Sequence, residues 1–309
     1  MGSARWDPGK WGTMKASLSS TSFDDKFTTR SHAAVDKTFV PKHIEARESR
    51  DSDPNPKSTP IILALDCTGS MNPVINEACD RMGDLMLEII KREPITDPHI
   101  LAMMVGDVEC DRMPLQVTQF EADERVIEQF KKLYVEGGGG GNRYESYHLP
   151  WYFAALKCQT DSWAKRKKKG YLFVVGDELP PPTLTKEQLQ SVFGRDEPGE
   201  TLTGEQILRM AEKQWEVFQI VVEQGSNYRA LGHDASMKPW VNLLGQRAIR
   251  LSDIKALPEV VVSAIQVNEG ADADAVANSW SGSTAVAVRN AVKDLAPSKG
   301  GTTESVVNL

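Results

Sequence analysis

The stretch IILALDCTGSMNP, from Ile61 to Pro73, changes character abruptly at its sixth residue. The five residues before that point are apolar and suit a buried strand. Asp66 follows directly, and hydroxyls come two and four residues later, at Thr68 and Ser70. Such a set at the end of a strand could hold a metal ion, or Asp66 could be a nucleophile.

Around this stretch, apolar runs alternate with segments whose apolar residues have helical spacing. Strands are predicted at 60–65, 99–108, 114–120, 171–176, 215–225 and 247–252, and helices at 74–91, 121–133, 147–158, 185–193, 203–214, 236–245 and 254–268. This pattern predicts an α/β fold with a doubly wound, mostly parallel six-stranded sheet and helices on both faces. Asp66 and Asp177 both follow predicted strands, so we expect them in one crevice at the carboxyl ends.

Three regions are expected along the chain. Residues 1–58 form a polar N-terminal arm that ends in an apparent linker, RESRDSDPNPKSTP, although Trp6 and Trp11 are expected to pack on the core or, second, on a partner. Residues 59–268 form the main domain. Residues 269–309 form an Ala-, Ser- and Gly-rich tail with one short helix, on which Val288, Val292 and Leu295 share a side, and with a disordered end. Arm and tail could mediate assembly, including a homo-oligomer.

Composition narrows the class of protein. The 309 residues carry a net charge of −7, which argues against a general grip on nucleic acid. No apolar run is long enough to span a membrane, and the first residues lack the apolar core of a secretory signal. The four cysteines are widely spaced and form neither a zinc framework nor a disulfide scaffold, so a cytoplasmic location is expected.

The residues after the first strand predict a cation site. One carboxylate and two hydroxyls are hard oxygen ligands that suit Mg²⁺ or Mn²⁺. Ser70 could instead cap the first long helix. Asp177 offers a second carboxylate, and the glycine run 137–141 is followed by three oxygen-bearing candidates, Asn142, Glu145 and Ser146. Cys67 points away from Asp66 on an extended strand and is expected in the core.

The stretches LALDCTGSM, GGGGGNRYES and FVVGDELP together resemble the von Willebrand factor A domain, over residues 59–267. The resemblance implies a metal-ion-dependent adhesion site of bacterial or phage cytoplasmic type, with Asp66, Thr68 and Ser70 in its first element and Asp177 in its last. The familiar Gly-Gly-x-Thr of the middle loop is absent, so Glu145 is the preferred third element, with Asn142 and Ser146 as rivals.

What this resemblance implies is recognition rather than catalysis. In the family, Mg²⁺ keeps an open position that an acidic residue of a protein partner fills. Relatives often serve as adaptors to AAA ATPases or as subunits of larger assemblies, which is analogy at the level of the fold. Nucleic acid and membrane are not expected partners.

A phosphatase is the competing interpretation. DCTGS also resembles the signature of haloacid dehalogenase-like phosphatases, in which Asp66 would accept the phosphoryl group and Asp177 would hold Mg²⁺. That family needs a lysine on a separate, earlier element, whereas the cluster here abuts the fourth strand, at Lys165 and 167–169, and is more simply a solvated helix end. His148 could tune the site but is more simply a satisfied core or surface histidine, and no HExxH, GxSxG or P-loop motif is present.

Overall fold

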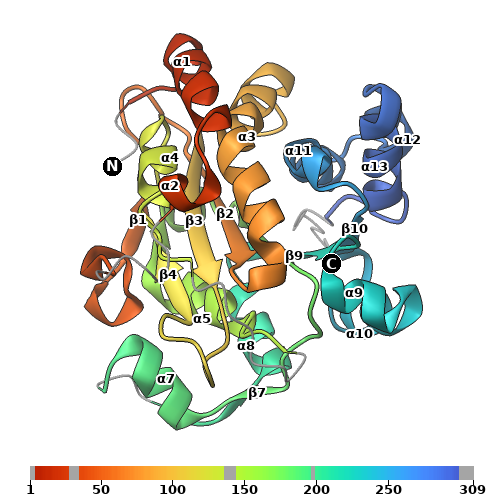
Figure 1. Cartoon of the computed structure of the whole chain (residues 1–309). Coiled ribbons are helices and arrows are strands. Elements are labelled where there is room, and N and C mark those ends of the chain that lie inside the picture. The colour runs from red at the N-terminus through yellow and green to blue at the C-terminus, as the bar shows by residue number, and fades with distance from the viewer. Residues whose placement is uncertain (1–3, 28–34, 136–143, 196–198, 299–309) are drawn as a thin grey trace, which may run out of the picture.

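The structure is a computed structural model of the whole chain, and it describes residues 4–27, 35–135, 144–195 and 199–298. Its centre is a six-stranded sheet in the order β10-β9-β6-β2-β3-β4 (Figure 1). The strands are β2 (Thr59–Asp66), β3 (Pro98–Val105), β4 (Leu115–Val117), β6 (Gly170–Gly176), β9 (Trp215–Val222) and β10 (Ala248–Leu251). All neighbours pair in parallel except β4, which lies antiparallel at one edge. The predicted doubly wound, mostly parallel α/β sheet is confirmed, and its topology is Rossmann-like.

Alternate residues of the central strand divide the core into two layers. Ile61, Leu63 and Leu65 of β2 face one helical layer, and Ile62 and Ala64 face the other, as the two-residue period of a strand requires. The first layer contains α1 (Pro8–Ser19), α3 (Asn72–Arg92), α4 (Arg125–Phe130), α11 (Leu257–Asn268) and α13 (Gly282–Val292). The second contains α5 (His148–Lys157), α7 (Lys186–Phe193), α8 (Gly204–Ala211), α9 (Ser226–Leu231) and α10 (His233–Leu244). Both faces of the sheet are therefore covered, which explains why its strands are almost wholly apolar.

The remaining α-helices and strands are short. They are α2 (Phe23–Lys26), α6 (Asp161–Arg166), α12 (Ala273–Asn278), the parallel pair β1 (Arg47–Ser49) and β5 (Cys158–Thr160), and the antiparallel pair β7 (Thr183–Leu184) and β8 (Leu202–Thr203). The prediction of a linker is wrong at Arg47–Ser49, because these residues pair with a strand more than a hundred positions away, which no local pattern records. Pro150 lies in the first turn of α5, where a missing N–H costs nothing.

Both ends of the described chain pack on the central domain. Trp11 of α1 lies against α3 and donates its indole N–H to Asp84, and Trp6 is buried beside it, so the expectation that both tryptophans pack on the core is confirmed. Val288 and Val292 of α13 are buried, as predicted for one side of a short helix, whereas Leu295 is buried but follows the end of that helix. The predicted disordered end, 299–309, lies outside the described residues. No helix within the described ranges is long and apolar enough to cross a membrane.

Candidate functional site

The two central strands define the place where a ligand site is expected. The chain leaves β2 through α3 towards β3 on one side, and β6 continues through α7 and α8 towards β9 on the other. A parallel sheet forms a crevice where its strand order reverses, beyond the carboxyl ends of the strands. Leu65 pairs with Val175, so β2 and β6 end side by side, with Asp66 closing one and Asp177 directly following the other.

Asp66 is fully buried, and both of its carboxylate oxygens have partners. Oδ1 accepts the backbone N–H of Thr68 at 2.8 Å and its hydroxyl at 2.6 Å. Oδ2 accepts the hydroxyl of Tyr147 at 2.7 Å. Ser70 lies in a short 3-10 helix, Gly69–Met71, that leads into α3, and its side chain is outside the described part of the structure. The local turn thus holds two of the predicted ligands, Asp66 and Thr68, against each other.

Glu145 lies near the carboxyl ends of the strands, because the charges of Asp66 and Asp107 act on it. Glu145 is 3% exposed, and its Oε2 atom has no hydrogen-bond partner in the described structure. Ser146 has a structural contact instead, because its hydroxyl accepts the N–H of Val108 at 2.9 Å. The third candidate, Asn142, and the glycine run 137–141 lie outside the described residues.

Asp177 is held by backbone N–H groups, among them those of the segment that follows β9. Its Oδ2 accepts the N–H of Asn227 at 2.8 Å, whereas its Oδ1 is buried and has no partner in the described structure. Gly225 permits this approach, since a Cβ there would lie 2.1 Å from Asp177 Oδ2. Asp177 is therefore fixed by the loop after β9 with one oxygen left over.

The pKa values reflect this burial. Burial raises the pKa of Asp66, and the charge of Asp177 raises it further, against hydrogen bonds from Thr68 and Tyr147 that lower it. Burial also raises the pKa of Glu145, and the nearby charge of Asp66 adds to the effect. The pKa of Asp177 is raised by burial too. Within the described ranges, Lys and Arg form no ion pair with these three carboxylates, although Arg229 acts on Asp177 from further away.

Sequence reasoning missed Tyr147 and Asp107. Tyr147 is a buried aromatic residue just before α5, and nothing in the local pattern connects it with Asp66. Asp107 did have a signal, because Val105-Gly106-Asp107 repeats the Val-Gly-Asp that ends β6. Asp107 is buried beyond the carboxyl end of β3, and its charge raises the pKa of Glu145.

Two other predictions can be checked directly. His148 is buried, its Nε2 lies 2.9 Å from the carbonyl oxygen of Thr183, and burial lowers its pKa to about 4. It is therefore a core histidine, as in the simpler interpretation, with its Nε2 bonded and its buried Nδ1 without a hydrogen-bond partner among the described residues. Cys67 is fully buried in the first apolar layer, as expected.

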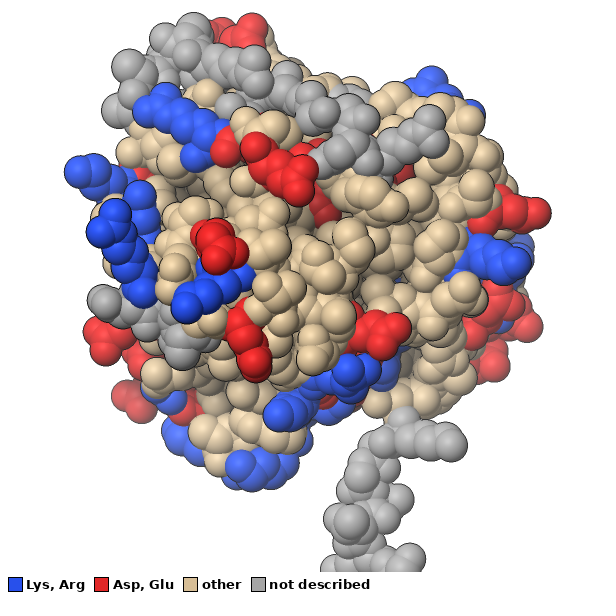
Figure 2. Space-filling view, turned by 90° about the horizontal axis from the view of Figure 1, so that it is seen from below, with Lys and Arg blue, Asp and Glu red and all other residues tan. Residues whose placement is uncertain are grey.

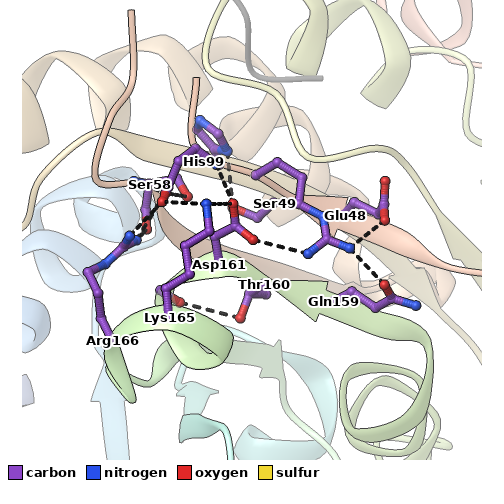
Figure 3. A network of polar contacts seen from close by, with 12 residues as sticks. Glu48, Ser49, Ser58, His99, Gln159, Thr160, Asp161, Lys165 and Arg166 are labelled. Atoms are coloured by element: carbon purple, nitrogen blue, oxygen red, sulfur yellow. Dashed lines mark hydrogen bonds and ion pairs between the residues drawn. The ribbon is translucent and has the colours of Figure 1, made fainter. Parts of the chain in front are cut away.

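The lysines that a phosphatase would need lie at the opposite end of the sheet. Lys165 and its neighbours precede Gly170, where β6 begins, and Asp66 closes β2 at its carboxyl end. Lys165 binds Asp51 and Asp161 in a polar network (Figure 3). Lys168 pairs with Glu269 at 3.1 Å, and Lys169 lies 3.8 Å from Glu216. The phosphatase alternative gains no support from this arrangement.

The described histidine, cysteine and carboxylate side chains of this protein do not by themselves form a metal site. Among the described residues, no three or more of these side chains are grouped so that they could hold an ion. The predicted ligand set relies also on the hydroxyls of Thr68 and Ser70.

Figure 2 views the face onto which the carboxyl ends open, and its central part is largely uncharged, with Lys and Arg mainly towards the rim.

Comparison with known proteins shows only distant similarity. No protein-family model matches the chain, and no curated protein matches it. Among solved structures, the chain is similar to the pilus adhesin SpaC from Lactobacillus rhamnosus GG in its open conformation, with 9% identity, a TM-score of 0.46, and coverage of 69% of this chain and 30% of SpaC. It is also similar to BatB, a conserved hypothetical protein from Bacteroides thetaiotaomicron, with 12% identity, a TM-score of 0.30, and coverage of 53% and 66%. The chain spans well under two thirds of SpaC, and scores this low carry no argument about function.

Proposed function

We propose that this chain is a recognition module of the von Willebrand factor A type, whose crevice between β2 and β6 binds Mg²⁺ or Mn²⁺ and, through it, an acidic residue of a protein partner. One observation carries the proposal. Two buried carboxylate oxygens, Glu145 Oε2 and Asp177 Oδ1, lack hydrogen-bond partners among the described residues. The charge of Asp177 acts on Asp66, and the charge of Asp66 acts on Glu145. Buried charges without partners are costly, so native proteins usually pair them or use them to hold a metal.

The donors fit a hard divalent cation. Asp66, Glu145 and Asp177 offer carboxylates, and Thr68 and Ser70 offer hydroxyls, which are the oxygen ligands that Mg²⁺ and Mn²⁺ prefer. A bound Mg²⁺ would supply a positive charge that balances these groups and attracts a carboxylate from outside.

The chain's own residues supply rigidity. Strand pairing between β2 and β6 fixes the spacing of the two strand ends. Thr68 orients Asp66 through two hydrogen bonds, and Asn227 orients Asp177 through one. Such supporting contacts around ligands commonly change metal affinity by about 10- to 100-fold.

A melting experiment tests the proposal. The wild type should melt at a higher temperature in Mg²⁺ or Mn²⁺ than in EDTA, because a ligand that binds only the folded state stabilises it. Asp177→Asn should lose this rise. Asp161→Asn is the matched control, since Asp161 is also a buried aspartate but accepts hydrogen bonds from Arg50 and from the N–H of Asp51 at the other end of the sheet. The proposal would be contradicted if neither cation raised the melting temperature of the wild type, or if the rise persisted in Asp177→Asn.

The partner follows from the same chemistry. It should present an Asp or Glu side chain, as an AAA ATPase or an assembly subunit of the cytoplasm could, or as a second copy of this chain could. Binding to such a partner should require the cation and should be lost in EDTA and in Asp66→Ala. Binding that is equally strong in EDTA would argue for a different surface.

A further inference from the structure

The central sheet ends at β10 on one side, and a groove opens along that edge. No described strand pairs with β10 on the side away from β9. The groove has a volume of about 370 Å³ and lies between α10, in the second apolar layer, and α13, in the first (Figure 1). Ala248, Ile249 and Arg250 of β10 form part of its lining. The edge of the strand is thus reached from outside between two helices.

The backbone of β10 has hydrogen-bonding groups left over on that edge. The N–H of Glu223 donates to the carbonyl of Leu251 at 3.0 Å, so Leu251 faces β9. Backbone groups alternate in direction along a strand, so Ala248 and Arg250 turn theirs to the free edge. The N–H of Ala248 donates to Gly245, whereas among the described residues nothing bonds to its carbonyl or to either backbone group of Arg250. Such an edge is a template for another strand.

Both walls of the groove are held in place. The segment after α13 is fixed by Gln246, whose side chain accepts the N–H of Ala296 at 3.1 Å and donates to its carbonyl at 3.3 Å. On the other side, α10 is anchored by Trp240, whose indole N–H donates to the carbonyl of Glu178 at 2.9 Å. The groove is therefore preformed, which lowers the entropic cost of binding.

Neither the chain's own tail nor a second β10 edge suits this groove. Residues 299–309 lie outside the described structure and continue from Ser298, which Arg247 contacts just before β10. The chain reaches β10 from β9 through the second helical layer but leaves it through α11 and α13 of the first. A tail strand beyond β10 would thus have a connection of the opposite hand, whereas connections between parallel strands nearly always share one hand. A second copy's β10 lies between the same two helices, which would hold the two edges apart.

The lining indicates which side chains a bound segment would carry. Apolar residues of α10 line one wall, and Val241 among them is 46% exposed. Of the charged Lys, Arg, Asp and Glu side chains that line the groove, Arg250 and Lys293 are positive and Asp294 is negative. Glu223, the partner of Arg250, does not line it. Successive side chains of a strand point to opposite sides, so apolar residues facing α10 would alternate with acidic ones facing Lys293.

We infer that this groove binds an extended segment of a partner protein, which adds to β10 as a further strand and alternates apolar with acidic side chains. Recognition by strand addition takes its affinity from main-chain hydrogen bonds and its specificity from alternate side chains. The inference goes beyond the proposed function, because it uses neither a cation nor the carboxylates at the carboxyl ends of the strands.

Fluorescence anisotropy of a labelled octapeptide of alternating Val and Glu, titrated with the full chain in EDTA, tests the inference. The wild type should bind it, and a peptide of alternating Val and Lys should bind at least about tenfold more weakly. Val241→Glu should weaken binding of the Val-Glu peptide by about tenfold, because it places a like charge on the groove wall. Val286→Glu is the matched control, since Val286 of α13 is 56% exposed but does not line the groove. It should leave the dissociation constant unchanged.

The main-chain contacts are tested with N-methylated peptides. Methylation of one of the two sets of alternate peptide nitrogens should abolish binding, because it removes the N–H groups that face β10. Hydrogen exchange at the Arg250 amide should slow when the unmodified peptide binds. The inference is overturned if the wild type does not bind the Val-Glu peptide, if the Val-Lys peptide binds as tightly, or if binding persists in Val241→Glu or after both methylations. None of these results bears on the cation site, since no cation is present.

Discussion

Buried or partly buried acidic groups gather at both ends of the central sheet, but within the described chain only the amino end pairs them with Lys or Arg. At the amino end, Asp51 and Asp161 lie among Arg50, Lys165 and Arg166 (Figure 3). At the carboxyl end, Asp66, Glu145 and Asp177 have no Lys or Arg ion pair within the described chain, and two of their oxygens have no partner. The same residue types therefore have different roles at the two ends.

The pKa shifts express this difference in opposite directions. Burial alone would raise the pKa of Asp51, but hydrogen bonds from Arg166, Ser58 and Lys165 outweigh it and hold that pKa well below its usual range. At the carboxyl end, burial outweighs the hydrogen bonds that Asp66 accepts from Thr68 and Tyr147, and the pKa values of Asp66 and Glu145 are raised. A carboxylate with a lowered pKa stabilises the fold at neutral pH, whereas one with a raised pKa destabilises it. The comparison separates carboxylates that stabilise the fold from carboxylates whose burial costs stability.

Breaking the amino-end network should have the largest effect on stability. Arg166 donates to both oxygens of Asp51 and to the carbonyl of Ser58. Arg166→Ala leaves a mostly buried carboxylate with fewer partners, so the free energy of unfolding should fall by about 2 kcal/mol. Urea denaturation measures this. Arg209→Ala is the control, because the Arg209–Glu205 pair is exposed, and it should change stability by less than about 0.5 kcal/mol.

Neutralising the carboxyl end should have the opposite sign. Burial raises the pKa of Glu145 to about 10, so the folded protein must hold a proton there that the unfolded chain releases at neutral pH. Glu145→Gln removes this cost, so in EDTA the variant should be more stable than the wild type by about 1 kcal/mol. In Mg²⁺ the order should reverse, since the variant has lost a ligand. Thermal melts in the two buffers show both results. A Glu145→Gln variant that is less stable than wild type in EDTA would mean that Glu145 has a structural partner.

These contrasts show how far sequence reasoning could reach. The sheet, its order of helices and strands, and the meeting of Asp66 with Asp177 followed from apolar runs and the rule for parallel sheets. The contact of Tyr147 with Asp66 did not, because it depends on how α5 packs over the sheet. The anchoring of Asp51 by Arg166 joins residues more than a hundred positions apart, and no local pattern predicts it.

A pH series sharpens the comparison further. Asp66, Glu145 and Asp177 have higher pKa values in the folded protein than in the unfolded chain, where a carboxyl group has a pKa of about 4. The folded protein therefore holds their protons more tightly. This stabilises the fold relative to neutral pH when the pH is below about 4, and the advantage is lost as the pH rises. In EDTA, the gain from Glu145→Gln should therefore grow with pH from about 4 upwards. Asp51 has a lowered pKa, so its contribution is present above about 4 and is lost as pH falls. The loss from Asp51→Asn should shrink towards low pH. If the change in the free energy of unfolding varied with pH in the same direction for both variants, the comparison would be contradicted.

The smallest effect on stability is expected at the carboxyl end of β3, where the sequence repeats the Val-Gly-Asp of β6. Asp107 follows β3 in the same Val-Gly-Asp context as Asp177 follows β6, and both aspartates are buried. Their carboxylates differ, because Asp107 Oδ1 accepts the N–H of Glu109 at 2.9 Å and Oδ2 lies 3.2 Å from Cys110 Sγ, within its own turn. Asp107→Asn keeps an oxygen for the Glu109 N–H, so stability should change by less than about 0.5 kcal/mol.

Titration of Mg²⁺ into the two matched variants then locates the site. Asp107→Asn removes a charge near Glu145 but no ligand, so the dissociation constant should rise only about two- to fivefold, an electrostatic effect of under about 1 kcal/mol. Asp177→Asn should abolish binding. If Asp107→Asn were the variant that lost Mg²⁺, the cation would sit between β2 and β3. In that case the position of the site would not be explained by the reversal of strand order between β2 and β6.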